Sequence, residues 1–357
     1  MFTLRKLPVS IVATLILALL MSITVASAQE AALGGSVNFR DAEALNDSLE
    51  INLSGVPAIS GSYEGWLIDA AGDKISVGVM KRIVDGTLTG TYVSPSGEDL
   101  LATYVAFALS QEPSPDPDPG TAGPILYSDR IPPAVESHLQ ALVVGESSIA
   151  GALRDQAQVA VTHGILAQTS TTLADKKTHA QHVVNIVDGL GGPGDGIGLI
   201  KHANDAAAEG AAARGAASDD ASVAAVAAEV VSAANNTIRN AERARDAALR
   251  VLDLTTDDIR VRLELENVVS LSRMALNGTD EDGDGIKGNA GAEGGANTVY
   301  TKSQDLGQFE PQQGTDPLSP VTGDLVVPAL ALVALIAGLL FTFGGGMMMF
   351  RRHRTAA

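Results

Sequence analysis

Three aspartates alternate with other residues in one short acidic segment, at Asp280, Asp282 and Asp284. Carboxylates at the first, third and fifth positions of a loop, with a glycine at the sixth, place hard oxygen ligands around one point, which suits calcium. Gly285 occupies the sixth position, and the backbone carbonyl of Ile286 follows at the seventh, where calcium loops use a main-chain ligand. The segment therefore predicts a calcium site.

The twelfth position of this loop differs from that of an EF-hand. Gly291 stands where a bidentate glutamate is required, and Glu293 comes two residues later. The segment resembles instead the shorter acidic loops of dockerin-like and thrombospondin type 3 repeats. That resemblance implies calcium, with Glu293 or water completing the ligand shell. A solvated acidic linker is the alternative interpretation.

Histidines offer a second kind of metal chemistry. His179 and His182 are three residues apart in a predicted helix, so both imidazoles lie on one face of it. The same region also carries His138, His163 and His202, and a transition metal could be held inside a helical bundle by such side chains. The alternative is that these histidines are partly buried in helix contacts and bind no metal.

The motifs of familiar enzyme classes are missing from the sequence. There is no Gly-x-Ser-x-Gly elbow for a serine hydrolase and no cysteine for thiol chemistry. The glycine-rich segment 191–198 lacks the Lys-Ser/Thr pair of a phosphate-binding loop, so a tight turn between helices is the better interpretation. We predict no enzymatic activity and no catalytic residues.

Both ends of the chain carry targeting patterns. Arg5 and Lys6 precede an apolar run and small residues at 26–28, which predicts a signal peptide over residues 1–28. Residues 325–350 contain no charge and are followed by an arginine-rich tail at 351–357, which predicts one transmembrane helix and a cytoplasmic tail. The sequence thus predicts a single-pass cell-membrane protein with its N-terminal ectodomain outside.

The segment before the predicted membrane helix suggests another fate. Ser319 to Asp324, the apolar span and the basic tail resemble the sorting signal of Gram-positive surface proteins that sortase cleaves. The resemblance implies cleavage between Thr322 and Gly323 and attachment to the cell wall, although Ser319 replaces the leucine of that family's motif. A plain membrane anchor is the alternative.

The charge of the exported part limits its partners. Between the signal peptide and the predicted membrane helix, 42 acidic residues stand against 19 of the 24 basic ones, a net charge of −23. Such a surface repels nucleic acid and favours cations or basic partners. We expect an extracellular protein or glycan partner, and the absence of cysteine in an exported chain is typical of bacterial proteins.

The chain divides by pattern into a β part and a helical part. Residues 29–132 alternate polar and apolar residues between turn residues, which predicts an antiparallel β-sandwich. Residues 133–277 are alanine-rich with helical periodicity, which predicts a bundle whose clearest helix begins at Ser218. Residues 278–324, rich in Gly, Asp, Gln and Pro, predict a stalk.

Within the β part, an ordered set of segments resembles a known family. They are Tyr63 to Ile68, Ser76 to Gly78, Phe107 to Pro113 and Gly123 to Leu126. Together they are similar to the extracytoplasmic C-terminal domain of anti-sigma-K factors, over about residues 45–130. The resemblance implies a β-sandwich and an envelope location. Regulation of a sigma factor is not implied, because the sigma-binding helical domain is missing.

The predicted fold class is α+β with several parts: an N-terminal antiparallel β-sandwich, an all-α bundle, a stalk and one C-terminal transmembrane helix. The predicted function is that of a structural or partner-binding module at the cell surface, stabilised by calcium. The alternative is an extracytoplasmic transition-metal-binding protein that uses histidines of the bundle.

Overall fold

The computed structural model describes residues 33–83, 85–285, 293–314 and 317–318. The chain separates into two compact units, Met1–Pro317 and Leu318–Ala357. The sheet and the helices described below all belong to the first unit. The predicted signal peptide and the Thr322–Gly323 bond lie outside the described residues.

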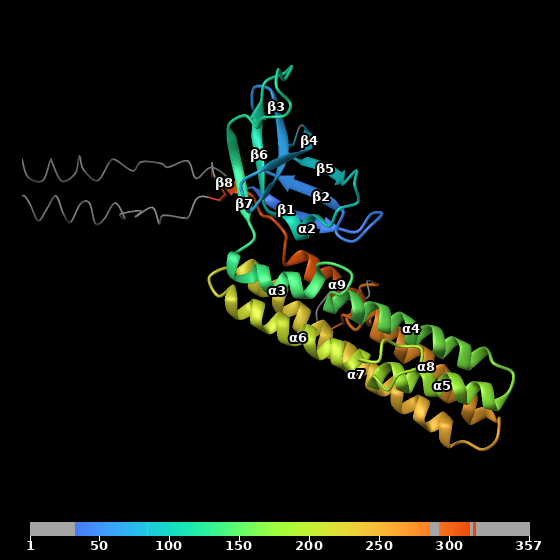
Figure 1. The fold of residues 1–357 in the computed structure, drawn as a ribbon. Helices are drawn as coiled ribbons and strands as arrows, with labels where there is room; N and C mark the ends of the chain where they lie inside the picture. Colours follow the sequence, from blue (N-terminus) through green and yellow to red (C-terminus); the bar gives the residue numbers. More distant parts are fainter. Residues whose placement is uncertain (1–32, 84, 286–292, 315–316, 319–357) are drawn as a thin grey trace, which may run out of the picture. The chain divides into compact units, whose positions relative to one another are not determined.

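The β part is one antiparallel sheet of eight strands in the order β1-β2-β5-β4-β3-β6-β7-β8 (Figure 1). The strands are β1 (Gly34–Arg40), β2 (Ser48–Ser54), β3 (Ser62–Asp69), β4 (Lys74–Arg82), β5 (Leu88–Val93), β6 (Tyr104–Glu112), β7 (Ile125–Arg130) and β8 (Gln312–Gln313). The side chains of β3 and β6 are buried on both faces over most of their length. These two strands therefore form the centre of the sheet.

The predicted two-layer β-sandwich is wrong, because the strands form a single open half-barrel. β4 is responsible: it pairs with β3 up to Met80 and then with β5 through Lys81 and Arg82, so the ladder runs without a break. Gly78, with a φ of 106°, and a register shift between Gly65 and Trp66 lie where these strands pair. Such irregularities bend strands and allow one sheet to curl.

Among the described residues, the helical part contains six helices, and two shorter ones lie outside it. The six are α3 (Pro133–Val143), α4 (Ile149–Thr169), α5 (Leu173–Asp188), α6 (Leu199–Ala216), α7 (Ala221–Asp253) and α8 (Ile259–Asn277). The others are α2 (Leu100–Thr103) and α9 (Ala296–Asp305). Small alanines on the buried stripe of α7 allow its neighbours to pack closely. The long helices α4, α5, α7 and α8 are neighbours in the bundle (Figure 1).

Caps explain where the helices begin and end. The Thr172 hydroxyl accepts a hydrogen bond from the amide of Asp175 at the start of α5, and Gly189 ends that helix with a φ of 74°. The helix predicted to begin at Ser218 is α7, which begins at Ala221. Its cap is Asp220, two residues after Ser218, which accepts hydrogen bonds from the amides of Ser222 and Val223. The glycine-rich segment 191–198 is the turn between α5 and α6.

The predicted stalk is wrong for its described part. Helix α9 packs against α3, α4, α7 and β1, and β8 adds to the edge of β7. Between them, Phe309 forms two backbone hydrogen bonds of 2.9 Å with Val37 of β1. Residues 309–313 therefore contact both edge strands of the half-barrel, and this late segment is part of the fold.

Polar side chains on α9 join it to the end of β1. The Tyr300 hydroxyl lies 2.9 and 3.0 Å from the two carboxylate oxygens of Asp41, and Gln304 donates to Asp41 at 2.8 Å. Asp305 forms an ion pair of 2.8 Å with Arg40. Burial and the neighbouring Asp41 carboxylate raise the pKa of Tyr300 well above its usual range, so its hydroxyl stays protonated and donates.

The predicted transmembrane helix, residues 325–350, lies outside the described residues. Within the described part of the chain, none of the helices has both the length and the apolar character that crossing a bilayer requires.

Candidate metal centres

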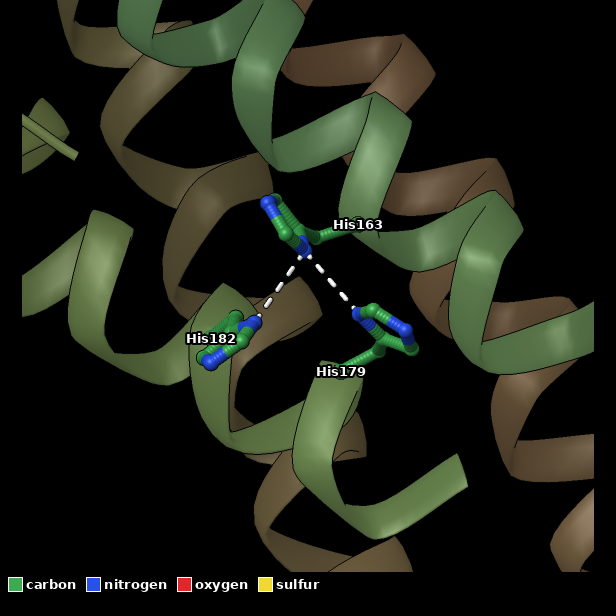
Figure 2. A group of neighbouring side chains, drawn as sticks. All are labelled: His163, His179 and His182. Carbon is green, nitrogen blue, oxygen red and sulfur yellow. Dashed lines mark hydrogen bonds between the residues drawn. The ribbon is translucent and has the colours of Figure 1, made fainter. Parts of the chain in front are cut away.

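Three histidines meet on the hairpin formed by α4 and α5. His163 lies on α4, and His179 and His182 lie on one face of α5 (Figure 2). The turn between the helices centres on Thr171, which is eight residues after His163 and eight before His179. In an antiparallel hairpin, positions equally far from the turn lie side by side, so the turn brings His163 level with the pair on α5.

The nitrogen atoms already stand at the spacing of metal ligands. His163 Nδ1 lies 3.2 Å from His179 Nδ1 and 3.3 Å from His182 Nδ1 (Figure 2). Two nitrogens bound to one tetrahedral zinc ion at about 2.05 Å are separated by about 3.3 Å. One ring nitrogen from each histidine falls within a group whose atoms all lie within 4.8 Å of one another.

Hydrogen bonding alone leaves this arrangement incomplete. A neutral imidazole nitrogen either carries one hydrogen or accepts, so His163 Nδ1 can donate to one neighbour and not to both. Burial lowers the pKa of His163, and the neighbouring His182 and His179 lower it further. Burial and His179 lower the pKa of His182 too. Neutral imidazoles are the form that binds metals, and all three side chains are only partly buried.

The other two bundle histidines have carboxylate partners. His138 Nδ1 lies 2.7 Å from Glu209, and His202 Nε2 lies 2.6 Å from Asp195. They are separate from the triad and have the role of ordinary helix contacts. Sequence reasoning selected His179 and His182 as ligands and named His163 only together with His138 and His202, as further histidines of the same region. The equal distance of His163 and His179 from the turn was the available indication.

The acidic loop forms a second cluster. Oxygen atoms of Asp280, Asp282 and Glu293 lie within 4.8 Å of one another. Asp280 accepts hydrogen bonds from the amides of Gly283 and Gly285, at 2.8 and 3.1 Å. These bonds wind the loop around the Asp280 carboxylate, as the alternating aspartates and glycines predict.

Glu293 closes the loop from the far side. It is 3% exposed, and its Oε1 accepts hydrogen bonds from the amides of Glu281 and Asp282, at 2.6 and 2.8 Å. Its Oε2 is buried without a hydrogen-bond partner among the described residues. Asp284 is not in the converging group, and Ile286 lies outside the described residues.

No protein family, no curated protein and no solved structure matches this chain.

Proposed function

We propose that this chain is an exported protein that binds a first-row transition-metal ion, such as Zn²⁺ or Cu²⁺, through His163, His179 and His182. The observation that carries the proposal is the spacing of their Nδ1 atoms, 3.2 and 3.3 Å around His163 (Figure 2). Imidazole nitrogen suits zinc, copper and nickel, and no thiolate is available in this chain to favour softer ions.

The number of ligands favours an exchangeable metal ion rather than a purely structural one. Structural zinc sites have four protein ligands, whereas three histidines leave a position for water or another ligand. The three side chains are partly exposed, so that position is open to solvent. Metal binding or delivery outside the cytoplasm fits this arrangement. The interaction role predicted from the sequence remains a prediction, as does the envelope location.

Zinc titration followed by calorimetry tests the proposal. We expect one zinc ion per chain. Loss of an outer-shell partner of a metal ligand weakens metal binding roughly 10- to 100-fold, so His163→Ala, which removes a ligand itself, should weaken zinc binding at least that much. His138→Ala is the matched control, because it removes another partly buried bundle histidine, which contacts Glu209 instead. Equal zinc affinities of the two variants would rule the triad out.

The pH dependence of zinc binding is a second measurement on the same variants. Protons compete with zinc for the imidazole nitrogens, so affinity should fall as the pH drops. Because burial holds the pKa of His163 and His182 below the ordinary 6.5, the loss should set in below about that pH. An affinity that rises on acidification would contradict binding by neutral histidines.

A second binding function, calcium at the acidic loop, is favoured by the buried and unpartnered Oε2 of Glu293. A carboxylate oxygen held away from water without a donor is costly, and a cation beside Asp280 and Asp282 would satisfy it. Such an ion would stabilise the connection between α8 and α9.

Hydrogen exchange measured by mass spectrometry tests the calcium proposal. We expect millimolar calcium to slow exchange several-fold in peptides that cover residues 279–285, because the ion fixes the loop. Glu293→Gln keeps the acceptor for the loop amides and loses the charge, so it should abolish the calcium effect. Glu281→Gln, on an exposed side chain of the same loop, should leave it unchanged. Calcium-insensitive exchange in the unmodified protein would reject this site.

A further inference from the structure

Two glutamates lie buried on one face of the central strands of the sheet. Glu64 of β3 is directly opposite Ser110 of β6, and Glu112 follows two residues later on the same strand. Since side chains on a strand alternate between faces, these three share one face. Glu64 is 4% exposed and Glu112 is 2% exposed.

A third carboxylate reaches the pair from the proline-rich loop that follows β6. Oxygen atoms of Glu64, Glu112 and Asp116 lie within 4.8 Å of one another. Asp116 is partly exposed, so the group connects to solvent through this side chain. The three residues come from two strands and a loop and share no element with the histidine triad or the acidic loop.

Donors hold each glutamate in a fixed orientation. The hydroxyl of Ser76 donates to Glu64, and that of Ser110 donates to Glu112. Glu112 also accepts a hydrogen bond of 2.7 Å from the amide of Gly123. A side chain at Gly123 would approach the other Glu112 oxygen to 2.8 Å, so only glycine fits beside this carboxylate. The oxygens are thus positioned before any ligand arrives.

One oxygen in this group has nothing to bind. Glu64 Oε2 is buried and has no hydrogen-bond partner in the described part of the chain. Ion pairs among the described residues involve none of the three carboxylates. Neighbouring carboxylates in a buried site repel one another unless a proton or a cation lies between them.

We propose that Glu64, Glu112 and Asp116 form a binding site for a hard divalent cation, with calcium preferred to magnesium. All the ligands are oxygens, which excludes a site selective for softer metals. Two ligands on opposite sides of calcium are about 4.6–5.2 Å apart, and on opposite sides of magnesium about 4.1 Å. The three oxygens all lie within 4.8 Å of one another, close enough to share one ion, and calcium is preferred because it accepts irregular carboxylate shells whereas magnesium demands a near-ideal octahedron and dehydrates reluctantly.

The chain contains one tryptophan, and it lies beside this site. Trp66 lies on the same face, and its indole Nε1 donates to Ser110 Oγ at 2.8 Å, while Ser110 in turn donates to Glu112. Terbium is a hard trivalent ion that replaces calcium and luminesces when a nearby indole transfers energy to it. Excitation at the long-wavelength edge of indole absorption selects tryptophan over tyrosine, and the Glu293→Gln variant reveals any contribution from an ion in the loop near Asp280.

The test is terbium luminescence of the full-length protein excited through Trp66. We expect saturable emission that calcium displaces at lower concentration than magnesium does. Glu64→Gln should reduce terbium affinity by more than tenfold while keeping the acceptor for Ser76. Absence of sensitised emission, or emission that survives Glu64→Gln unchanged, would overturn the proposal and leave a proton shared by the two glutamates.

Two further variants keep the test independent of folding. Asp116→Asn alters a partly exposed loop side chain, so it should weaken terbium binding several-fold without disturbing the sheet. Asp118→Asn is its matched control, an exposed aspartate two residues away whose carboxylate is outside the group. Equal affinities of these two loop variants would also overturn the proposal. Glu293→Gln should leave the Trp66-sensitised emission unchanged.

Discussion

Replacing Phe309 with alanine is expected to destabilise the protein by about 3–5 kcal/mol, the usual cost of removing a fully buried phenylalanine. The Phe309 ring is 0% exposed and packs edge-on against Phe39 of β1, with centroids 5.5 Å apart. It also stacks on Phe107 of β6, at 6.0 Å. The substitution would leave a cavity between strands from the two halves of the sheet, while the backbone bonds to Val37 could persist.

Chemical denaturation followed by Trp66 fluorescence measures this loss, because the indole is buried at the centre of the sheet. Leu190→Ala is the control, since Leu190 is 67% exposed and exposed substitutions change stability by about 0.5 kcal/mol or less. If Phe309→Ala cost no more than Leu190→Ala, residues 309–313 would behave as a tether and the stalk prediction would be restored.

The strands were easier to predict than the way they assemble. Alternation identified the region of β2 to β7, and it is clearest in β2 and β5, which expose every second residue over most of their length. A sandwich and a half-barrel share that pattern. The difference depends on β4 continuing from β3 to β5 through Lys81 and Arg82, and no local residue preference marks such a change of partner.

The composition of residues 278–324 suggested a stalk because it is rich in residues that break regular structure. Composition does not reveal a few long-range anchors. Val299 and Phe309 are fully buried, and Tyr300 and Gln304 are almost so, although they are spread among polar residues. Their partners on β1 and α4 are far away in sequence, so only the folded chain brings them together.

The candidate metal centres were predictable to the same limited extent. Local spacing predicted the acidic loop and placed His179 beside His182, because both depend on residues close in sequence. His163 joined them through a helical hairpin, and Glu64 met Glu112 through strand pairing. Neither partner could be assigned before the turn and the register were known.

Replacing Asn46 with alanine is expected to cost about 2–4 kcal/mol, because it combines lost buried hydrogen bonds with backbone strain. Asn46 is 0% exposed and has a φ of 50°. Its Nδ2 donates to the carbonyl of Val143 at the end of α3 and to Asp99, at 3.0 and 3.2 Å. Its Oδ1 accepts a hydrogen bond of 3.0 Å from Gln304 of α9.

Three comparisons separate these contributions in denaturation experiments. Asn46→Gly loses the same bonds but adopts positive φ freely, so it should be about 1 kcal/mol more stable than Asn46→Ala. Asn46→Asp should be the least stable, because a carboxylate would face the Val143 carbonyl and the Asp99 carboxylate, where only a donor is tolerated. Asn38→Ala, which loses only a bond to Ser36 within β1, should cost less than about 1 kcal/mol. If Asn46→Asp were more stable than Asn46→Ala, the Asn46 amide would not be what joins α3 and α9 to the sheet.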